Sequence, residues 1–111
     1  MCTCKNCLCS PYARFFETLA NENRLYILHA LRETPKSVSE ITQATGLEQT
    51  NVSHNLKRLK TCGFVTSERK GKTIIYTLRK DTIAPLLDHI EDHVNHYCRP
   101  LGAPCICEAT Q

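Results

Sequence analysis

The sequence predicts a mainly α-helical domain with one β-hairpin, in the order helix-helix-helix-helix-strand-strand-helix. Three observations support this fold class. Apolar residues recur at helical spacing up to Cys62, β-branched runs flank a two-residue turn at Gly71-Lys72, and helical spacing returns from about Thr82. With 111 residues, the chain is long enough for one small hydrophobic core.

The first two helices are marked by their apolar spacing. The first is predicted to begin at Pro11 and carries apolar residues at positions i, i+3, i+4 and i+7: Tyr12, Phe15, Phe16 and Leu19. The Asn-Glu-Asn sequence at 21–23 supplies capping residues for a second helix. That helix carries Leu25, Leu28 and Leu31, and we expect it to end near Thr34-Pro35.

The third and fourth helices are marked by their ends. Ser37-Val-Ser-Glu40 is a capping-box sequence that begins a short third helix, and Gly46 is predicted to end it. A fourth helix follows from about Glu48 to Cys62 and ends before Gly63. Its core-facing residues are predicted to be Val52, Leu56 and Leu59.

The hairpin and the last helix complete the domain. The runs FVTSERK and TIIYTL are rich in β-formers, and Gly71-Lys72 between them has the length of a tight hairpin turn. The last helix is predicted to run from about Thr82 to Tyr97, and Pro85 is tolerable in its first turn. Its apolar residues fall within an arc of roughly 100°: Ile83, Leu86, Leu87, Ile90, Val94 and Tyr97.

Charge is distributed unevenly, although the net charge is only +3. Residues 57–80 contain eight Lys or Arg and one acid, whereas residues 81–96 contain four acids, three His and no Lys or Arg. The first block suits a polyanion and the second a cation. No segment resembles a targeting signal and no apolar run approaches about 18 residues, so we expect a cytoplasmic protein without a membrane span.

A basic helix followed by a basic hairpin is the pattern of a winged helix-turn-helix. An α-helix fits the major groove, where polar and basic side chains contact base edges or phosphates, and a hairpin tip can contact the flanking backbone. The predicted DNA contacts are Gln49, Thr50, Asn51, Ser53, His54, Lys57, Arg58, Arg69, Lys70 and Lys72. The alternative is a solvated basic face on an ordinary helical domain.

Three segments resemble the ArsR/SmtB family of metal- and metalloid-responsive repressors. They are FFETLANENRLYILHAL, SVSEITQATGLEQTNVSHNLKRLKTCGFV and RKGKTIIYTL. The family motif Val-Ser-x-His-Leu-x-x-Leu appears here as VSHNLKRL, with His and Asn in exchanged order. The resemblance, over about residues 12–97, implies a homodimer joined mainly through its first and last helices. Its two reading helices would address the half-sites of a palindromic operator, and ligand binding would release that DNA. We divide the chain into a cysteine-rich arm (1–10), a winged helix-turn-helix domain for DNA binding and dimerisation (11–97) and a cysteine-containing tail (98–111).

Both ends of the chain carry candidate metal ligands. Two cysteines separated by one or two residues can reach the same ion, and soft thiolates select Zn, Cd, Pb, Cu(I) or As(III). Cytosolic thiols stay reduced, which disfavours disulfide staples, and the Cys-x-Cys spacing is tighter than that of ferredoxin clusters. The predicted ligands are Cys2, Cys4, Cys7, Cys9, Cys98, Cys105 and Cys107. The alternative is a thiol arm that scavenges metal without signalling.

The resemblance implies two further metal positions. Asp81, His93 and His96 lie where relatives bind metal across the dimer, although His96 replaces an acid and Thr82 replaces a histidine. Cys62 lies where cadmium and lead sensors use a cysteine of the fourth helix, but their second cysteine is replaced in this chain. The alternatives are polar residues that flank a dimer helix, and a small half-buried residue at a helix end.

A repressor that releases its operator on binding a thiophilic ion is therefore the leading prediction. A winged-helix regulator that senses oxidants or sulfur species through paired thiols remains an alternative, as does a metal-storage protein. The basic block at 57–80 disfavours storage. We predict no enzyme, because the sequence contains no phosphate-binding glycine loop, nucleophile elbow or HExxH motif.

Overall fold

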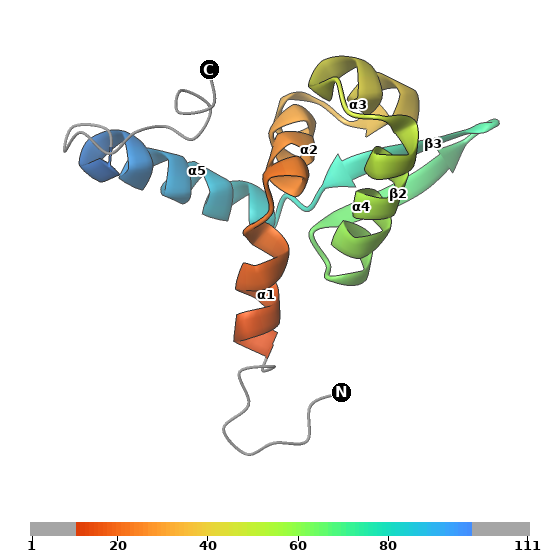
Figure 1. Ribbon diagram of the computed structural model, residues 1–111. Coiled ribbons are helices and arrows are strands. Elements are labelled where there is room, and N and C mark those ends of the chain that lie inside the picture. The colour runs from red at the N-terminus through yellow and green to blue at the C-terminus, as the bar shows by residue number, and fades with distance from the viewer. Residues whose placement is uncertain (1–10, 99–111) are drawn as a thin grey trace. The chain divides into compact units, whose positions relative to one another are not determined.

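The computed structural model describes residues 11–98, which form five α-helices, three strands and one π-helical turn (Figure 1). Their order is α1, α2, β1, α3, α4, β2, β3, α5 and η1, which is the predicted order with β1 and η1 added. The described residues fall into two compact units, one up to Arg79 and one from Lys80. Within residues 11–98, no helix combines the length and apolar character that a membrane span requires.

Helices α1 (Pro11–Leu19) and α2 (Glu22–Glu33) lie where the sequence predicts them. Asn21 is the N-cap of α2, and its side chain accepts a hydrogen bond of 3.0 Å from the backbone N–H of Arg24. The buried residues of α2 are Ile27, Leu28, Ala30 and Leu31. Leu25 is 42% exposed, because it lies about 120° around the helix from Leu31, at the edge of the buried side.

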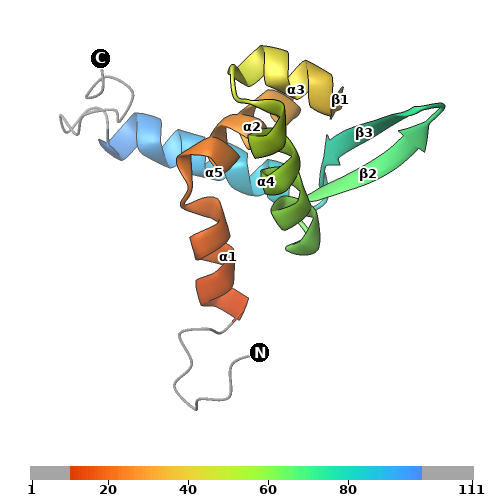
Figure 2. The same cartoon turned by 45° about the vertical axis from the view of Figure 1, so that its right-hand side comes forward.

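Helix α3 (Val38–Thr45) begins with both halves of the predicted capping box. The backbone N–H of Glu40 donates to Ser37 Oγ at 3.2 Å, and the backbone N–H of Ser37 donates to Glu40 Oε1 at 2.9 Å. Gly46 ends α3 with a φ of 78°, a left-handed conformation that glycine adopts without steric cost. Helix α4 (Gln49–Thr61) follows this turn, and α2, α3 and α4 pack against one another (Figure 2).

The core lies where these three helices meet each other and the sheet. The fully buried large residues include Ile27, Leu28, Ile41, Val52, Leu56, Leu59, Phe64 and Val65. Phe64 directly follows the turn after α4, and the Phe15 ring of α1 stacks on it with ring centroids 4.9 Å apart. Helix α1 is therefore anchored at the C-terminal end of α4.

The sheet has three strands rather than the two that the sequence predicts. Strands β2 (Val65–Lys70) and β3 (Thr73–Leu78) form the predicted hairpin, and Gly71 takes a φ of 65° in its turn. The added strand β1 (Lys36–Ser37) pairs antiparallel with β3, opposite Tyr76, which gives the order β1-β3-β2. A two-residue strand has no apolar periodicity, so sequence reasoning detected only the capping signal at this position.

The last helix differs from the prediction at its C-terminal end. Helix α5 (Ile83–His93) is followed by the π-helical turn η1 (Val94–Cys98) instead of continuing as an α-helix to Tyr97. A π-turn changes the angular spacing of side chains, so Tyr97 does not continue the predicted apolar arc. Its ring stacks on that of His93 with centroids 4.8 Å apart, while Ile90 and Tyr97 are 38% and 59% exposed.

Replacing Leu28 by alanine should lower the free energy of unfolding by about 2–5 kcal/mol, because truncating a buried leucine leaves a cavity. Leu28 is 1% exposed. Leu25→Ala, one turn earlier on the same helix, is the matched control and should cost less than about 1 kcal/mol. Urea unfolding followed by circular dichroism measures both variants. Equal losses would contradict the assignment of the buried side of α2.

Candidate nucleic-acid interface

Helix α4 has one fully buried side and one exposed side. Val52, Leu56 and Leu59 have no exposed surface, and they lie at the i, i+4 and i+7 positions of one helix face. The opposite side presents the exposed residues Thr50, Ser53, His54, Lys57 and Thr61, and Gln49 is exposed at the start of the helix. The core thus leaves most of the predicted DNA contacts of α4 accessible together, on an element that fits the major groove.

The beginning of α4 adds backbone donors to these side chains. The N-cap residue Glu48 makes no side-chain capping hydrogen bond, and Gln49 and Thr50 in the first turn are exposed. The N–H groups and the positive end of the helix dipole at such a terminus favour phosphate. Asn51, in the same turn, is half-buried. Side-chain reasoning from the sequence did not identify this contribution of the backbone.

The β2–β3 hairpin extends away from α2, α3 and α4 (Figures 1 and 2). The three predicted wing contacts, Arg69, Lys70 and Lys72, are exposed at its tip. Lys70 Nζ lies 3.8 Å from Glu68 Oε1, but the two side chains are 66% and 74% exposed. Such an exposed ion pair contributes little to stability, so Lys70 can exchange it for a phosphate.

Arg58, one of the predicted DNA contacts, forms a hydrogen bond with a residue of α1. Its Nη2 donates to Glu17 Oε1 of α1 at 3.2 Å. Hydrogen bonds with the Cys62 side chain and with Glu17 raise the pKa of Arg58 above its ordinary value. Sequence reasoning missed Glu17, because the two residues are 41 positions apart and nothing local indicates their pairing. Glu17 therefore competes with DNA for the Arg58 guanidinium group.

Cys62 belongs to the same junction between α1 and α4. It is the C-cap residue of α4 and is half-buried, and its Sγ lies 3.4 Å from Oγ1 of the buried Thr18. Neither Cys62 nor Cys98, the two cysteines within residues 11–98, forms a disulfide. The surroundings of Cys62 suit a small residue that packs at a helix end.

Most of the predicted metal ligands lie outside residues 11–98: Cys2, Cys4, Cys7, Cys9, Cys105 and Cys107. Within residues 11–98, no three His, Cys, Asp or Glu side chains come together to hold one ion. Asp81, His93 and His96 are exposed, and His96 Nδ1 donates to the Asp92 carbonyl at 2.8 Å. A site shared across a dimer draws ligands from two chains, so both metal sites stay predictions.

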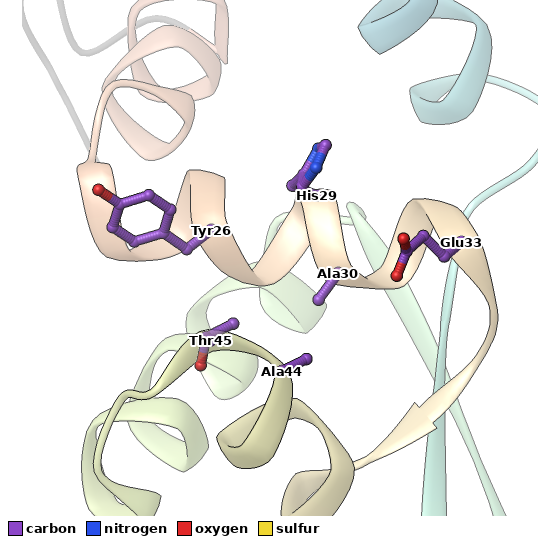
Figure 3. Close-up of a pocket in the computed structure, with 6 residues that line it drawn as sticks. All are labelled: Tyr26, His29, Ala30, Glu33, Ala44 and Thr45. Carbon is purple, nitrogen blue, oxygen red and sulfur yellow. The ribbon is translucent and has the colours of Figure 1, made fainter. Parts of the chain in front are cut away.

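A pocket of about 270 Å³ lies between α2 and α3 (Figure 3). Its lining residues are Tyr26, His29, Ala30, Glu33, Ala44 and Thr45. His29 and Glu33, one turn apart on α2, supply one imidazole and one carboxylate. A structural zinc site uses four protein ligands and a catalytic one uses three, so the pocket by itself does not complete a metal site.

Comparison with known proteins points to one family. Residues 21–67, which span α2 to β2, match the model of the arsR family of bacterial regulatory proteins. The transcriptional regulator NmtR of Mycobacterium tuberculosis is 39% identical over 84 residues, which cover 76% of this chain and 70% of NmtR. The cadmium resistance transcriptional regulatory protein CadC of Listeria innocua is 36% identical over 75 residues, covering 67% of this chain and 63% of CadC.

A solved structure gives the same result for the fold. The homodimeric winged helix-turn-helix DNA-binding domain of Mb0332 from Mycobacterium bovis superposes with a TM-score of 0.69. It is 31% identical, and the match covers 87% of this chain and 94% of that one. The predicted winged helix-turn-helix is therefore confirmed.

Glu17→Gln should change the free energy of unfolding by less than about 1 kcal/mol, because ion pairs of exposed side chains contribute little. The Glu17 side chain is 75% exposed. The same substitution should raise affinity for an operator duplex, since it replaces the ion pair of Arg58 by a weaker neutral hydrogen bond and removes a negative charge that repels phosphate. Fluorescence anisotropy with a labelled duplex measures this affinity.

The matched control is Glu33→Gln, which removes the same charge from an exposed carboxylate 3.8 Å from Lys36. If both variants raised affinity equally, the effect would be one of net charge, and the predicted contact of Arg58 with DNA would lose its support.

Proposed function

The chain belongs to the arsR family of bacterial regulatory proteins, and from that premise we propose that it is a repressor that releases its operator on binding a thiophilic ion. The family and the relatives above are DNA-binding transcriptional regulators and not enzymes. One observation carries the proposal for DNA. The polar side of α4 is exposed opposite a fully buried stripe, and a hairpin with three exposed cations follows it.

We propose that the repressor is a homodimer that binds a palindromic operator in the cytoplasm. The Mb0332 domain, which shares the fold, is homodimeric. In this chain, Tyr12 and Phe16 of α1 are 79% and 61% exposed, and large exposed aromatics of this kind are enriched in subunit interfaces. A two-fold dimer presents two α4 helices to two symmetric half-sites, and this symmetry supports the proposal of a palindrome.

The proposed inducer is Cd, Pb, Zn, Cu(I) or As(III), bound by thiolates from both ends of the chain. The relative CadC is named for cadmium resistance, and soft sulfur ligands select ions of this group. Seven of the eight cysteines lie at positions 2–9 and 98–107. Among them, Cys98 is the member within the described part of the chain, half-buried at the end of η1.

Helix α1 offers a route from the N-terminal arm (residues 1–10) to α4, the proposed reading helix. Residues 1–10 directly precede α1 in the sequence. Helix α1 contacts the end of α4 and the turn that follows it at three points. These are the Phe15–Phe64 ring stack, the Glu17–Arg58 ion pair and the Thr18–Cys62 contact. For release, the ion must bind better to a dimer geometry that fits DNA poorly, and DNA must then weaken ion binding by the same factor.

His54→Ala should weaken operator binding by about 1–3 kcal/mol if His54 contacts a base, and should affect a random duplex less. Lys70→Ala or Lys72→Ala should weaken binding to both duplexes similarly and flatten the salt dependence, because these residues would contact phosphate. Anisotropy titrations over a series of salt concentrations measure both effects. If only the wing variants lost affinity, α4 would not be the reading helix.

Replacing Cys2, Cys4, Cys7 and Cys9 by serine should abolish operator release by the ion while leaving the affinity of the metal-free protein unchanged. In the wild type, a coupling of about 1–3 kcal/mol weakens DNA binding roughly 5- to 150-fold. The measurement is a titration of the protein–operator complex with Zn, Cd, Pb, Cu(I) and arsenite. If the variant released DNA at the same ion concentration, the sensor would lie elsewhere, with Asp81, His93 and His96 as the next candidates.

Two controls sharpen this titration. Cys62→Ser removes a thiol outside both terminal clusters and should leave binding of the ion intact, whereas operator release can change because Cys62 contacts Thr18 of α1. Peroxide or persulfide in metal-free buffer tests the redox alternative, and release of DNA under these conditions would favour disulfide formation over metal binding.

A further inference from the structure

Arg24 joins three helices through its guanidinium group. It lies in the first turn of α2, and its Nε donates to the Thr18 carbonyl at the end of α1 at 2.7 Å. Its Nη1 donates to Oδ1 of Asn55, in the middle of α4, at 3.2 Å. Asn55 is only 6% exposed. A polar network thus lies beneath the reading helix, beside its apolar stripe.

The orientation of the Asn55 amide is fixed from both sides. A guanidinium group can only donate, so Asn55 must present its oxygen to Arg24. The Asn55 Nδ2 donates to the backbone carbonyl of Asn51 at 2.9 Å, and a carbonyl can only accept. An obligate donor and an obligate acceptor therefore impose the same orientation, and a flipped amide would lose both hydrogen bonds.

This orientation determines which end of the Asn51 amide is turned inward. Asn55 Nδ2 also donates to Oδ1 of the Asn51 side chain. Because that contact requires an acceptor, the Asn51 oxygen faces Asn55, and the NH₂ group on the other side of the planar amide is left for other partners. Asn51 lies in the first turn of α4, where residues of a recognition helix contact base edges.

We propose that Arg24 and Asn55 are positioning residues that make Asn51 a hydrogen-bond donor to DNA, so that it selects an acceptor. This inference rests on the proposed function as a DNA-binding regulator. A free asparagine commonly recognises adenine with both ends of its amide, accepting from N6 and donating to N7. With its oxygen turned toward Asn55, Asn51 instead suits an acceptor: O6 or N7 of guanine, O4 of thymine, N7 of adenine, or a phosphate oxygen. Cytosine, which presents only a donor in the major groove, does not suit it.

Selection of duplexes from a pool with a randomised core tests this on the full-length, reduced, metal-free chain. The wild type should disfavour cytosine at one position in each half-site, and Asn51→Ala should reduce that discrimination by roughly 2- to 10-fold, the effect of one hydrogen bond. If Asn51 donates to a phosphate, Asn51→Ala should weaken all duplexes equally and leave every base preference intact. The two results distinguish a base acceptor from a phosphate acceptor.

Asn55→Asp tests the positioning role directly. A carboxylate can still accept from Arg24 but cannot donate, so the Asn51 amide should turn over and offer its oxygen to DNA. At a base contact, cytosine, whose amino group donates, should then become acceptable, and guanine and thymine, which present only acceptors in the major groove, should become disfavoured. Asn23→Asp on α2 is the matched control: it adds the same charge outside the network and should leave the preferences unchanged.

Hydrogen exchange of side-chain amides, measured by NMR on the wild-type protein without DNA, gives a second readout. It does not depend on whether a variant folds. The Asn55 amide protons should exchange more slowly than those of Asn51. Equal protection of both amides would overturn the inference. The inference would also be overturned if the protein bound an operator and Asn51→Ala changed neither its affinity nor its base preferences. The proposed function would stand in that case. A wild-type chain that enriched no sequence would overturn the proposed function and the inference with it.

Discussion

The complete burial of one side of α4 is the constraint on which the rest of this structure depends. Val52, Leu56 and Leu59 are fully buried, and each such side chain contributes about 1.5–3 kcal/mol relative to an exposed position. Because this stripe must face α2, α3 and the sheet, the opposite side of α4 must face solvent. The orientation of the reading helix is thus set by its apolar residues, and its polar residues are free to serve recognition.

In the proposed function, the junction between α1 and the end of α4 is the route by which a signal reaches that helix. A ring stack, an exposed ion pair and a thiol–hydroxyl contact hold it together. Aromatic pairs and surface ion pairs contribute on the order of 1 kcal/mol each. Allosteric couplings are typically about 1–3 kcal/mol, so the rearrangement of a few such contacts is sufficient to change DNA affinity. A junction fixed by a large apolar interface would resist regulation on this scale.

Hydrophobic packing positions α4, but it does not determine which way the amide groups of its asparagines point. The hydrogen bonds beneath α4 determine that orientation. Arg24 cannot accept a hydrogen bond, so it fixes the orientation of the Asn55 amide, which in turn directs the Asn51 oxygen toward Asn55. Buried polar groups are costly unless they are fully satisfied, which gives such a network a single preferred arrangement. Arg24, a half-buried residue of α2, thereby influences which chemical group the surface of α4 presents.

The sequence by itself determined the elements whose signals are local: the four N-terminal helices, the hairpin at Gly71 and the capping box of Ser37 with Glu40. It also indicated the reading helix and wing, because periodicity and capping act over a few neighbouring residues. Only the tertiary structure decided that β1 joins the sheet, that the last helix loosens into η1, and that Arg58 pairs with Glu17. The pairs Arg24–Asn55 and Glu17–Arg58 are 31 and 41 positions apart, so neither contact exists until the packing of the core has brought their helices together.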